Sequence, residues 1–170
     1  MKLVRPTKKY AAGWKRAVGE FRKDNKTIKL WEVLGDPDDL DLVIKTARLH
    51  SQDKNLPVDW VPYDIYWLVD GGEFIGIASV RHKLNADLEF RGGHIGYEVV
   101  ASKRGKRYGN KILELSLQKA KELRLEKVLV TSFEGNAASW KIIEKNGGKM
   151  ENKIKAGGEN DLARRYWIDL

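Results

Sequence analysis

The sequence contains no cysteine, only four prolines and only three histidines in 170 residues. Without cysteine, the chain has neither a disulfide framework nor a thiolate that could hold a metal or act as a nucleophile. Three scattered histidines also argue against a structural zinc site, so no metal is predicted. No apolar run approaches the roughly 18 residues that cross a bilayer, and the first ten residues lack the apolar region of a signal peptide. We therefore expect a cytoplasmic protein without a membrane partner.

Internal repeats, low-complexity tracts and linkers rich in proline or serine are missing as well. This favours a single domain over residues 1–170. Hydrophobic residues make up 42% of the chain, and six Trp, six Tyr and four Phe are among them. Such a composition can build a sizeable core, which excludes a disordered chain.

The net charge of +8 is unevenly distributed along the sequence. Residues 1–29 carry ten basic and two acidic side chains, whereas residues 31–70 carry three basic and nine acidic ones. A basic first segment raises the alternative of nucleic-acid binding. Its apolar residues, however, recur at helical spacing and should face a core, which leaves none free to stack on bases: Tyr10, Trp14, Val18 and Phe21. We expect no nucleic-acid partner.

The pattern along the chain predicts a mixed α/β fold in the order β–α–α–β–β–β–α–β–α–β–β. Gly71 and Gly72 separate two apolar runs, as the turn of a hairpin would. Residues 94–100 and 127–133 read as buried strands, and the segment between them has the spacing of an amphipathic helix. The next helix should start at Asn136, a typical N-cap residue.

The stretch SKRGKRYGNK, residues 102–111, holds five basic side chains and two glycines where a strand gives way to a helix. Backbone N–H groups at a helix N-terminus are unpaired and attract anions, and glycine lets a phosphate approach the backbone closely. The spacing of Gly105 and Gly109 fits neither the Walker A loop nor the dinucleotide fingerprint. The residues alone are compatible with a solvated turn or with a pyrophosphate site.

The longer segment IGYEVVASKRGKRYGNKILELSLQKAKEL, followed by KVLVTSFEGNAASWKIIEKNGG, resembles the GNAT N-acetyltransferase superfamily. The family motif Arg/Gln-x-x-Gly-x-Gly/Ala is matched by residues 104–109, and its second segment by residues 136–147. The resemblance is specific over residues 93–148. It implies a GNAT-like fold with one mixed central sheet, and the predicted element order agrees with this.

By resemblance, the cofactor is acetyl-CoA and the reaction is direct acetyl transfer to a primary amine on a small molecule or a peptide. The backbones of Val99 and Val100 would bind the pantetheine arm and the thioester. Asn136 and Ser139 would approach the pantetheine, although Asn136 could serve as an N-cap alone. The pyrophosphate would be held by the loop and the first helical turn: Arg104, Gly105, Lys106, Arg107, Tyr108, Gly109 and Asn110.

Two positions depart from the family pattern. Arg107 stands where the family has its first motif glycine. Ile143 stands where many members have a tyrosine that protonates the departing thiolate, and Tyr108, Tyr166 and Ser139 are the substitutes we consider. A catalytically weak or inactive CoA-binding regulatory module is therefore the alternative function.

An amine nucleophile must lose a proton, so a general base is expected. Strand alternation places His94, Gly96 and Glu98 on one face of their strand. His94 is the first candidate because it titrates near neutral pH and lies where several family members carry a carboxylate base. Glu98 is the second and His82 the third. For each, a purely structural role is the alternative.

The acceptor is the least determined feature of the sequence. The acidic block of the second helix would favour a cationic amine, but its carboxylates could equally be helix caps: Asp36, Asp38, Asp39 and Asp41. Dimers are the commonest soluble oligomers, so a homodimer is the assembly we expect if the chain associates.

Overall fold

The first of two antiparallel sheets forms the centre of the computed structural model, which describes residues 1–24, 34–156 and 161–170. Its strands lie in the order β1 (Lys2–Val4), β2 (Tyr63–Asp70), β3 (Glu73–Arg81) and β4 (Ile95–Val99). Gly71 and Gly72 both have positive φ and turn the chain from β2 to β3, as the hairpin prediction requires. The long strands β2 and β3 are buried along almost their whole length.

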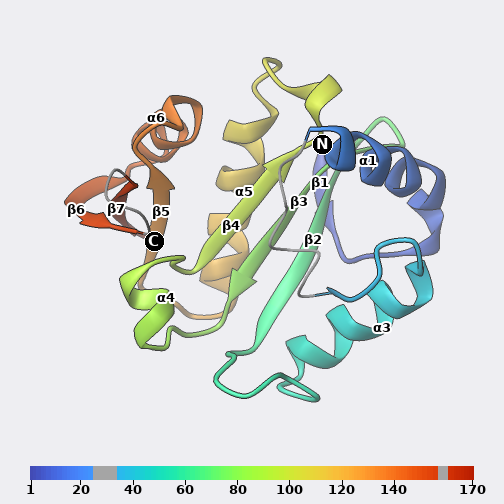
Figure 1. Ribbon diagram of the computed structural model, residues 1–170, viewed down its shortest axis with the longest axis horizontal. Helices are drawn as coiled ribbons and strands as arrows, with labels where there is room; N and C mark the ends of the chain where they lie inside the picture. Colours follow the sequence, from blue (N-terminus) through green and yellow to red (C-terminus); the bar gives the residue numbers. More distant parts are fainter. Residues whose placement is uncertain (25–33, 157–160) are drawn as a thin grey trace.

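The second sheet contains β5 (Lys127–Phe133), β6 (Lys149–Lys155) and β7 (Leu162–Asp169) in the order β5-β7-β6. Figure 1 shows this sheet and its helix set apart from β1–β4, on the left of the view. Strand β5 is covered on both faces, in keeping with its continuous apolar sequence. Strand β6 is the outer edge and is almost entirely exposed.

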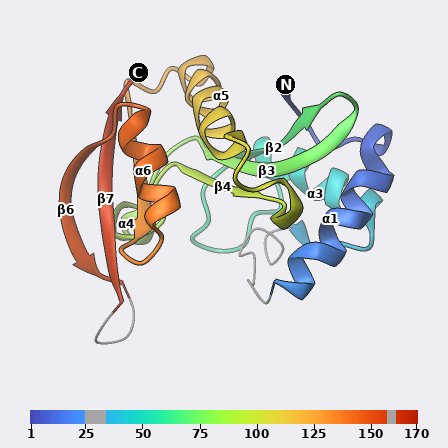
Figure 2. The same cartoon turned by 90° about the horizontal axis from the view of Figure 1, so that it is seen from above.

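Helices cover both faces of the first sheet. Figure 2 shows α1 (Ala11–Lys23) and α3 (Leu40–Ser51) to one side of the β2–β4 strands and α6 (Ala137–Lys145) beyond the other. Helix α5 (Tyr108–Glu122) packs on β3, β4 and α6. No helix in the described ranges has both the length and the apolar character needed to cross a bilayer.

The mixed α/β class is confirmed, and the described elements follow the predicted order with three short additions. These are helix α4 (Ala86–Phe90) between β3 and β4, and two 3₁₀ turns, η1 (Lys8–Tyr10) and η2 (Ala101–Lys103). Each addition is five residues or fewer, too short for a periodic pattern to be visible in the sequence.

The core between α1, α3 and the first sheet is built on aromatic side chains. Tyr10, Trp14, Val18 and Phe21 are all buried, as their spacing predicts. Trp14 stacks on Trp67 of β2 with ring centroids 4.8 Å apart. The aromatic residues of the basic first segment therefore hold α1 on the sheet.

In the described structure, strand pairing joins the two sheets only near the start of β4. The His94 amide donates to the Leu129 carbonyl (2.7 Å), and the Leu129 amide donates to Nδ1 of His94 (2.9 Å). Gly93 bridges to Val130, and an added Cβ at Gly93 would lie 2.3 Å from the Leu129 carbonyl oxygen. Beyond this junction, β4 pairs with β3 alone. The single mixed sheet expected from the sequence is thus divided in two.

The junction gives stability a pH dependence. Burial, together with the nearby charge of Arg81, lowers the pKa of His94 from 6.5 to about 4. The unfolded chain therefore binds more protons between these values, and stability falls as pH falls from 6.5 towards 4. We predict that His94→Gln, which has an acceptor but no titration, flattens this dependence in urea unfolding measured across that range. His50 is kept in both proteins, so its own lowered pKa cancels in the comparison. Equal slopes for the two proteins would contradict the prediction.

Candidate active site

A cavity of about 450 Å³ opens where β4 and β5 diverge. Its walls are β4, the loop that follows, the first turn of α5 and the first two turns of α6. Nine of the expected cofactor residues line it: Val99, Arg104, Gly105, Arg107, Tyr108, Gly109, Asn110, Asn136 and Ser139. Val100 and Lys106 do not line it.

The edge of β4 offers the cavity an open backbone. The Val100 amide donates to the Ile75 carbonyl of β3 (3.0 Å), and its carbonyl accepts from Lys103. Both backbone groups of Val100 are therefore used within the protein. Because backbone direction alternates along a strand, the N–H of Val99 points away from β3 toward the divided edge. Val99, and not Val100, can donate to a ligand there.

The loop after β4 presents a second set of donors. Among the described residues, no hydrogen-bond acceptor is found for the amides of residues 105–109, which lead into the first turn of α5. Unpaired amides at a helix N-terminus bind anions. Helix α1 anchors the start of the loop, because the Glu20 carboxylate accepts from both the amide (2.9 Å) and the hydroxyl (3.0 Å) of Ser102.

Arg107 adopts the left-handed conformation, with φ 63° and ψ 7°. The loop thus needs a positive φ at the position where the family has glycine, and this chain meets the need with an arginine. Arg107 is one of the residues that line the cavity. Here the backbone geometry is kept while a cation is added.

The Arg104 side chain is fully occupied by contacts within the protein and is not available to bind an anion. Its guanidinium donates to Asp24 at the end of α1 (2.6 Å), to Glu98 (2.7 Å) and to the Val99 carbonyl (3.1 Å). Burial alone would lower the pKa of Arg104, but these carboxylates raise it. Arg104 therefore joins the loop, β4 and α1. Its own amide donates to the Ala101 carbonyl (3.2 Å), so the free donors of the loop begin after Arg104.

Five residues of the cavity wall lay outside the sequence prediction: Tyr97, Ala138, Lys141, Ile142 and Lys145. The last four recur at helical spacing, so they share one face of α6. That spacing is visible in the sequence, but the direction of the face is not. Lys141 and Lys145 are exposed and add two cations to those of the loop.

Tyrosine hydroxyls differ in their access to the cavity. Tyr97 lies on β4 and its hydroxyl is 3.3 Å from the hydroxyl of Ser139 on α6. Tyr108 also lines the cavity, but its hydroxyl donates to Asp70 (3.3 Å). Tyr166 is fully buried and donates to Glu144, outside the cavity lining. Ile143 is buried in the core.

The three base candidates occupy different environments. Glu98 lines the cavity, on the face of β4 opposite Tyr97. His94 is buried in the junction between the sheets, where its Nδ1 already accepts from Leu129, and it does not line the cavity. His82 lies beside the buried carboxylate of Asp64, also outside the cavity lining. Only Glu98 is brought to the site.

The acidic block is engaged in fixing helices. Asp39 caps α3, and Asp36 accepts from the amide of Asp38. Asp38 pairs with Arg22 of α1, and Asp41 pairs with Lys8. These contacts match the capping alternative. No group of three histidine, aspartate or glutamate residues that could hold a metal exists in the ranges the structure covers.

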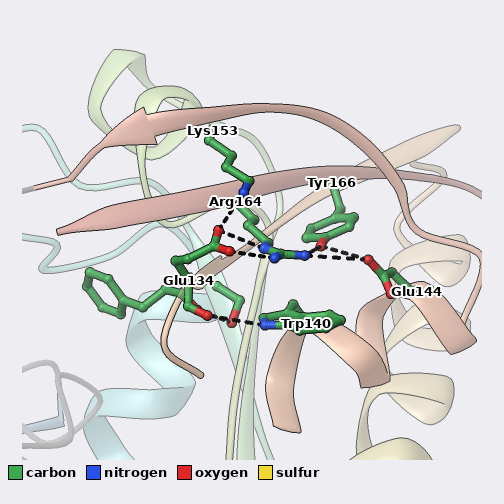
Figure 3. Close-up of polar contacts among 8 residues, drawn as sticks. Glu134, Trp140, Glu144, Lys153, Arg164 and Tyr166 are labelled. Carbon is green, nitrogen blue, oxygen red and sulfur yellow. Dashed lines mark hydrogen bonds and ion pairs between the residues drawn. The ribbon is translucent and has the colours of Figure 1, made fainter. Parts of the chain in front are cut away.

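A polar cluster fixes α6 against the second sheet (Figure 3). Arg164 of β7 donates twice to Glu134, in the turn just before α6, and lies 4.1 Å above the Trp140 ring. It also donates to Tyr166, which donates to Glu144 on α6. The Arg164 hydrogen bonds lower the pKa of Glu134 to about 2. The cluster therefore holds the helix that carries Asn136 and Ser139.

The fold and the cavity together are those of an α/β acetyltransferase domain. The family model described as acetyltransferase (GNAT) domain matches residues 4–149. The chain belongs to this family, and the resemblance noted in the sequence is confirmed.

Solved structures show the same fold at low identity. RimJ of Mycobacterium smegmatis, in complex with CoA-disulfide, is 16% identical, with a TM-score of 0.71 over 98% of this chain and 80% of that one. A ribosomal-protein-alanine N-acetyltransferase from Brucella melitensis is 16% identical, with a TM-score of 0.69 over the full length of both chains. The spermidine N-acetyltransferase SpeG of Vibrio cholerae is 14% identical, with a TM-score of 0.65 over 99% and 95%. No curated protein sequence matched the chain.

Replacing Arg107, the loop residue with a left-handed backbone, by glycine tests whether its positive φ costs stability. We predict that Arg107→Gly leaves the free energy of unfolding unchanged or raises it by up to about 1 kcal/mol, because glycine adopts positive φ without a Cβ clash. The matched variant Lys106→Gly changes a neighbour without positive φ and should lower stability by about 0.5–1 kcal/mol. Urea unfolding of both variants tests this. An equal loss in the two would contradict it.

The cluster around Arg164 should control the order of α6. We predict that Arg164→Ala speeds amide hydrogen exchange in residues 137–145 by about tenfold, because the turn before the helix loses its main anchor. Lys153→Ala is the control, since Lys153 pairs with the same Glu134 but is more exposed, at 41% against 16%. It should change exchange little. Equal effects of the two variants would show that Arg164 has no special part in ordering α6.

Proposed function

We propose that the protein transfers an acetyl group from acetyl-CoA directly to a primary amine. The single observation that supports this best is that one cavity is lined by residues with unpaired amides and by Val99, whose N–H points outward from β4. The residues with unpaired amides are Gly105, Arg107, Tyr108 and Gly109. The first set suits a pyrophosphate, and the second suits a carbonyl oxygen that becomes negatively charged. The family and its CoA-bound structural neighbour support the same donor.

The residues that line the cavity fit acetyl-CoA, the acetyl donor, along the length of the cavity. Amides of the loop and of the first turn of α5 would hold the pyrophosphate, with Arg107, Lys141 and Lys145 as counter-charges. Asn136 and Ser139 would bind the pantetheine arm, and the cap that Asn136 makes on α6 leaves its side-chain N–H₂ available. Bound acetyl-CoA supplies a thioester carbonyl that an amine can attack.

Groups of the protein would then stabilise the negative charge on the carbonyl oxygen and accept the proton of the amine. The Val99 N–H stabilises the oxygen of the attacked carbonyl. We assign the general base to Glu98, because it is the one expected base that lines the cavity. Arg104 holds the Glu98 carboxylate in place from the side of the loop. His94 is assigned to the junction between the sheets.

Amine acceptors also agree with the structural neighbours, whose names specify ribosomal proteins and spermidine. The acidic block gives no preference for a polyamine, since its carboxylates already have partners within the protein. Asp38 pairs with Arg22 and Asp41 with Lys8, while Asp36 and Asp39 accept from backbone amides. We therefore propose a primary amine on a small molecule or a peptide. A homodimer and a cytoplasmic location stay predictions.

Calorimetric titration with CoA, followed by acetyl transfer to a panel of primary amines and peptides, tests the proposal. We expect the wild-type protein to bind CoA and Glu98→Gln to bind it within about twofold, while the kcat of Glu98→Gln falls by about 10²-fold or more. His94→Gln, assayed per folded molecule, should lose far less.

Three results would change the assignment. Absence of CoA binding by the wild type would overturn the function. Tight CoA binding without transfer to any amine would favour the regulatory module instead. A larger loss in His94→Gln than in Glu98→Gln would move the base to His94.

A further inference from the structure

The cavity contains a pair of hydroxyl groups, those of Tyr97 and Ser139, and the proposed function has given no role to Tyr97. Tyr97 extends from β4 across the divided edge to α6, where its hydroxyl lies 3.3 Å from Oγ and 3.5 Å from the carbonyl oxygen of Ser139. Ser139 is held in the first turn of α6, because its amide donates to the Asn136 side chain (3.2 Å). The pair therefore links the two walls between which the cavity opens.

Position along β4 relates this pair to the reacting atoms. Tyr97 precedes Val99 by two residues, so their side chains share a face and their Cα atoms lie about 7 Å apart. A phenol two residues from the carbonyl-binding amide can reach the sulfur attached to that carbonyl. Glu98 lies between them in sequence and points to the opposite face, toward Arg104.

Resting on the proposed function, we propose that the Tyr97 hydroxyl, oriented by Ser139, donates the proton taken up by the departing CoA thiolate. This supplies from a strand the group that the sequence lacks on α6, where the corresponding residue is the buried Ile143. The other two expected donors are placed less well. Tyr108 directs its hydroxyl to Asp70, and Tyr166 lies outside the cavity lining.

The step balances in protons and electrons. The lone pair of the amine nitrogen forms the bond to the carbonyl carbon, and the carbon–sulfur bond then breaks, with its electron pair moving to sulfur. The sulfur takes the Tyr97 proton, and the electron pair of that O–H bond stays on the phenolate oxygen. A proton from water restores the phenol, while the proton lost by the amine passes to Glu98 and then to water. The products are an amide and the free CoA thiol.

The surroundings of Tyr97 keep its hydroxyl protonated. Burial, with a smaller contribution from the Glu98 charge, raises the pKa of Tyr97 to about 12. The phenol is therefore protonated throughout the neutral range. It is also a stronger acid than the aliphatic hydroxyl of Ser139, so Tyr97 is the donor of the pair and Ser139 its positioning partner.

The test follows the thiol of bound CoA itself and needs no acceptor. Because the chain has no cysteine, CoA supplies the only thiol of the complex, and the pH dependence of the rate at which iodoacetamide alkylates it gives the pKa of that thiol. A phenol that donates to sulfur stabilises the thiolate. We expect the thiol of CoA bound to the wild type to have a pKa about one unit lower than that of CoA bound to Tyr97→Phe. Ser139→Ala should give a value between the two.

Turnover supplies a second readout. Tyr97→Phe should lower kcat by about 10-fold to 10²-fold and leave the dissociation constant of CoA within about twofold, a modest loss because thiolates leave readily. Tyr66→Phe removes another buried phenol hydroxyl, bonded to Asp64 outside the cavity lining, and should keep the wild-type kcat and thiol pKa.

The outcomes separate this proposal from the function on which it rests. Failure of the wild type to bind CoA would remove both. If CoA binds equally to wild type and Tyr97→Phe with the same thiol pKa, only the role of Tyr97 is overturned. A rise in the CoA dissociation constant that accounts for the entire loss of activity would also overturn it, because Tyr97 would then be a binding residue alone.

Discussion

The hydrogen bonds between His94 and Leu129 join the two sheets at one end, and the candidate site depends on their not continuing. Past this junction, β3 is the only strand of the described residues that pairs with β4, and the N–H of Val99 points away from it. Gly93 permits the close approach, since a side chain there would collide with the Leu129 carbonyl. A buried histidine and a glycine thus set where the sheets separate, and the separation creates the cavity.

Local sequence patterns predicted much of the fold. The Asn136 cap, the hairpin at Gly71 and the helical spacing of Trp14 and Phe21 are short-range features, and each appears in the structure as predicted. The division of the sheet was not readable, because the apolar character of residues 94–100 and 127–133 is the same whether or not the strands pair. The structural role of His94 was not predictable from the sequence either, because Leu129, the residue to which it bonds, is 35 positions away.

Side-chain direction was the other missing information. Arg104 belongs to the family motif, yet its guanidinium turns to Asp24 and Glu98 because two carboxylates from α1 and β4 converge there. Tyr97 was not among the predicted site residues, because its approach to Ser139 depends on where α6 lies, and the Arg164 cluster contacts that helix from β7. Long-range ion pairs decided these positions, and ion pairs leave no periodic trace in a sequence.

The open edge of β4 also bears on aggregation through the edges of sheets. An unpaired strand edge is a template on which a strand of another chain can add and start aggregation. Here that edge is recessed between the first turn of α5 and helix α6, and these two helices flank it where a strand of another chain would have to add. The same recess that offers backbone donors to a ligand thereby shields them from other proteins.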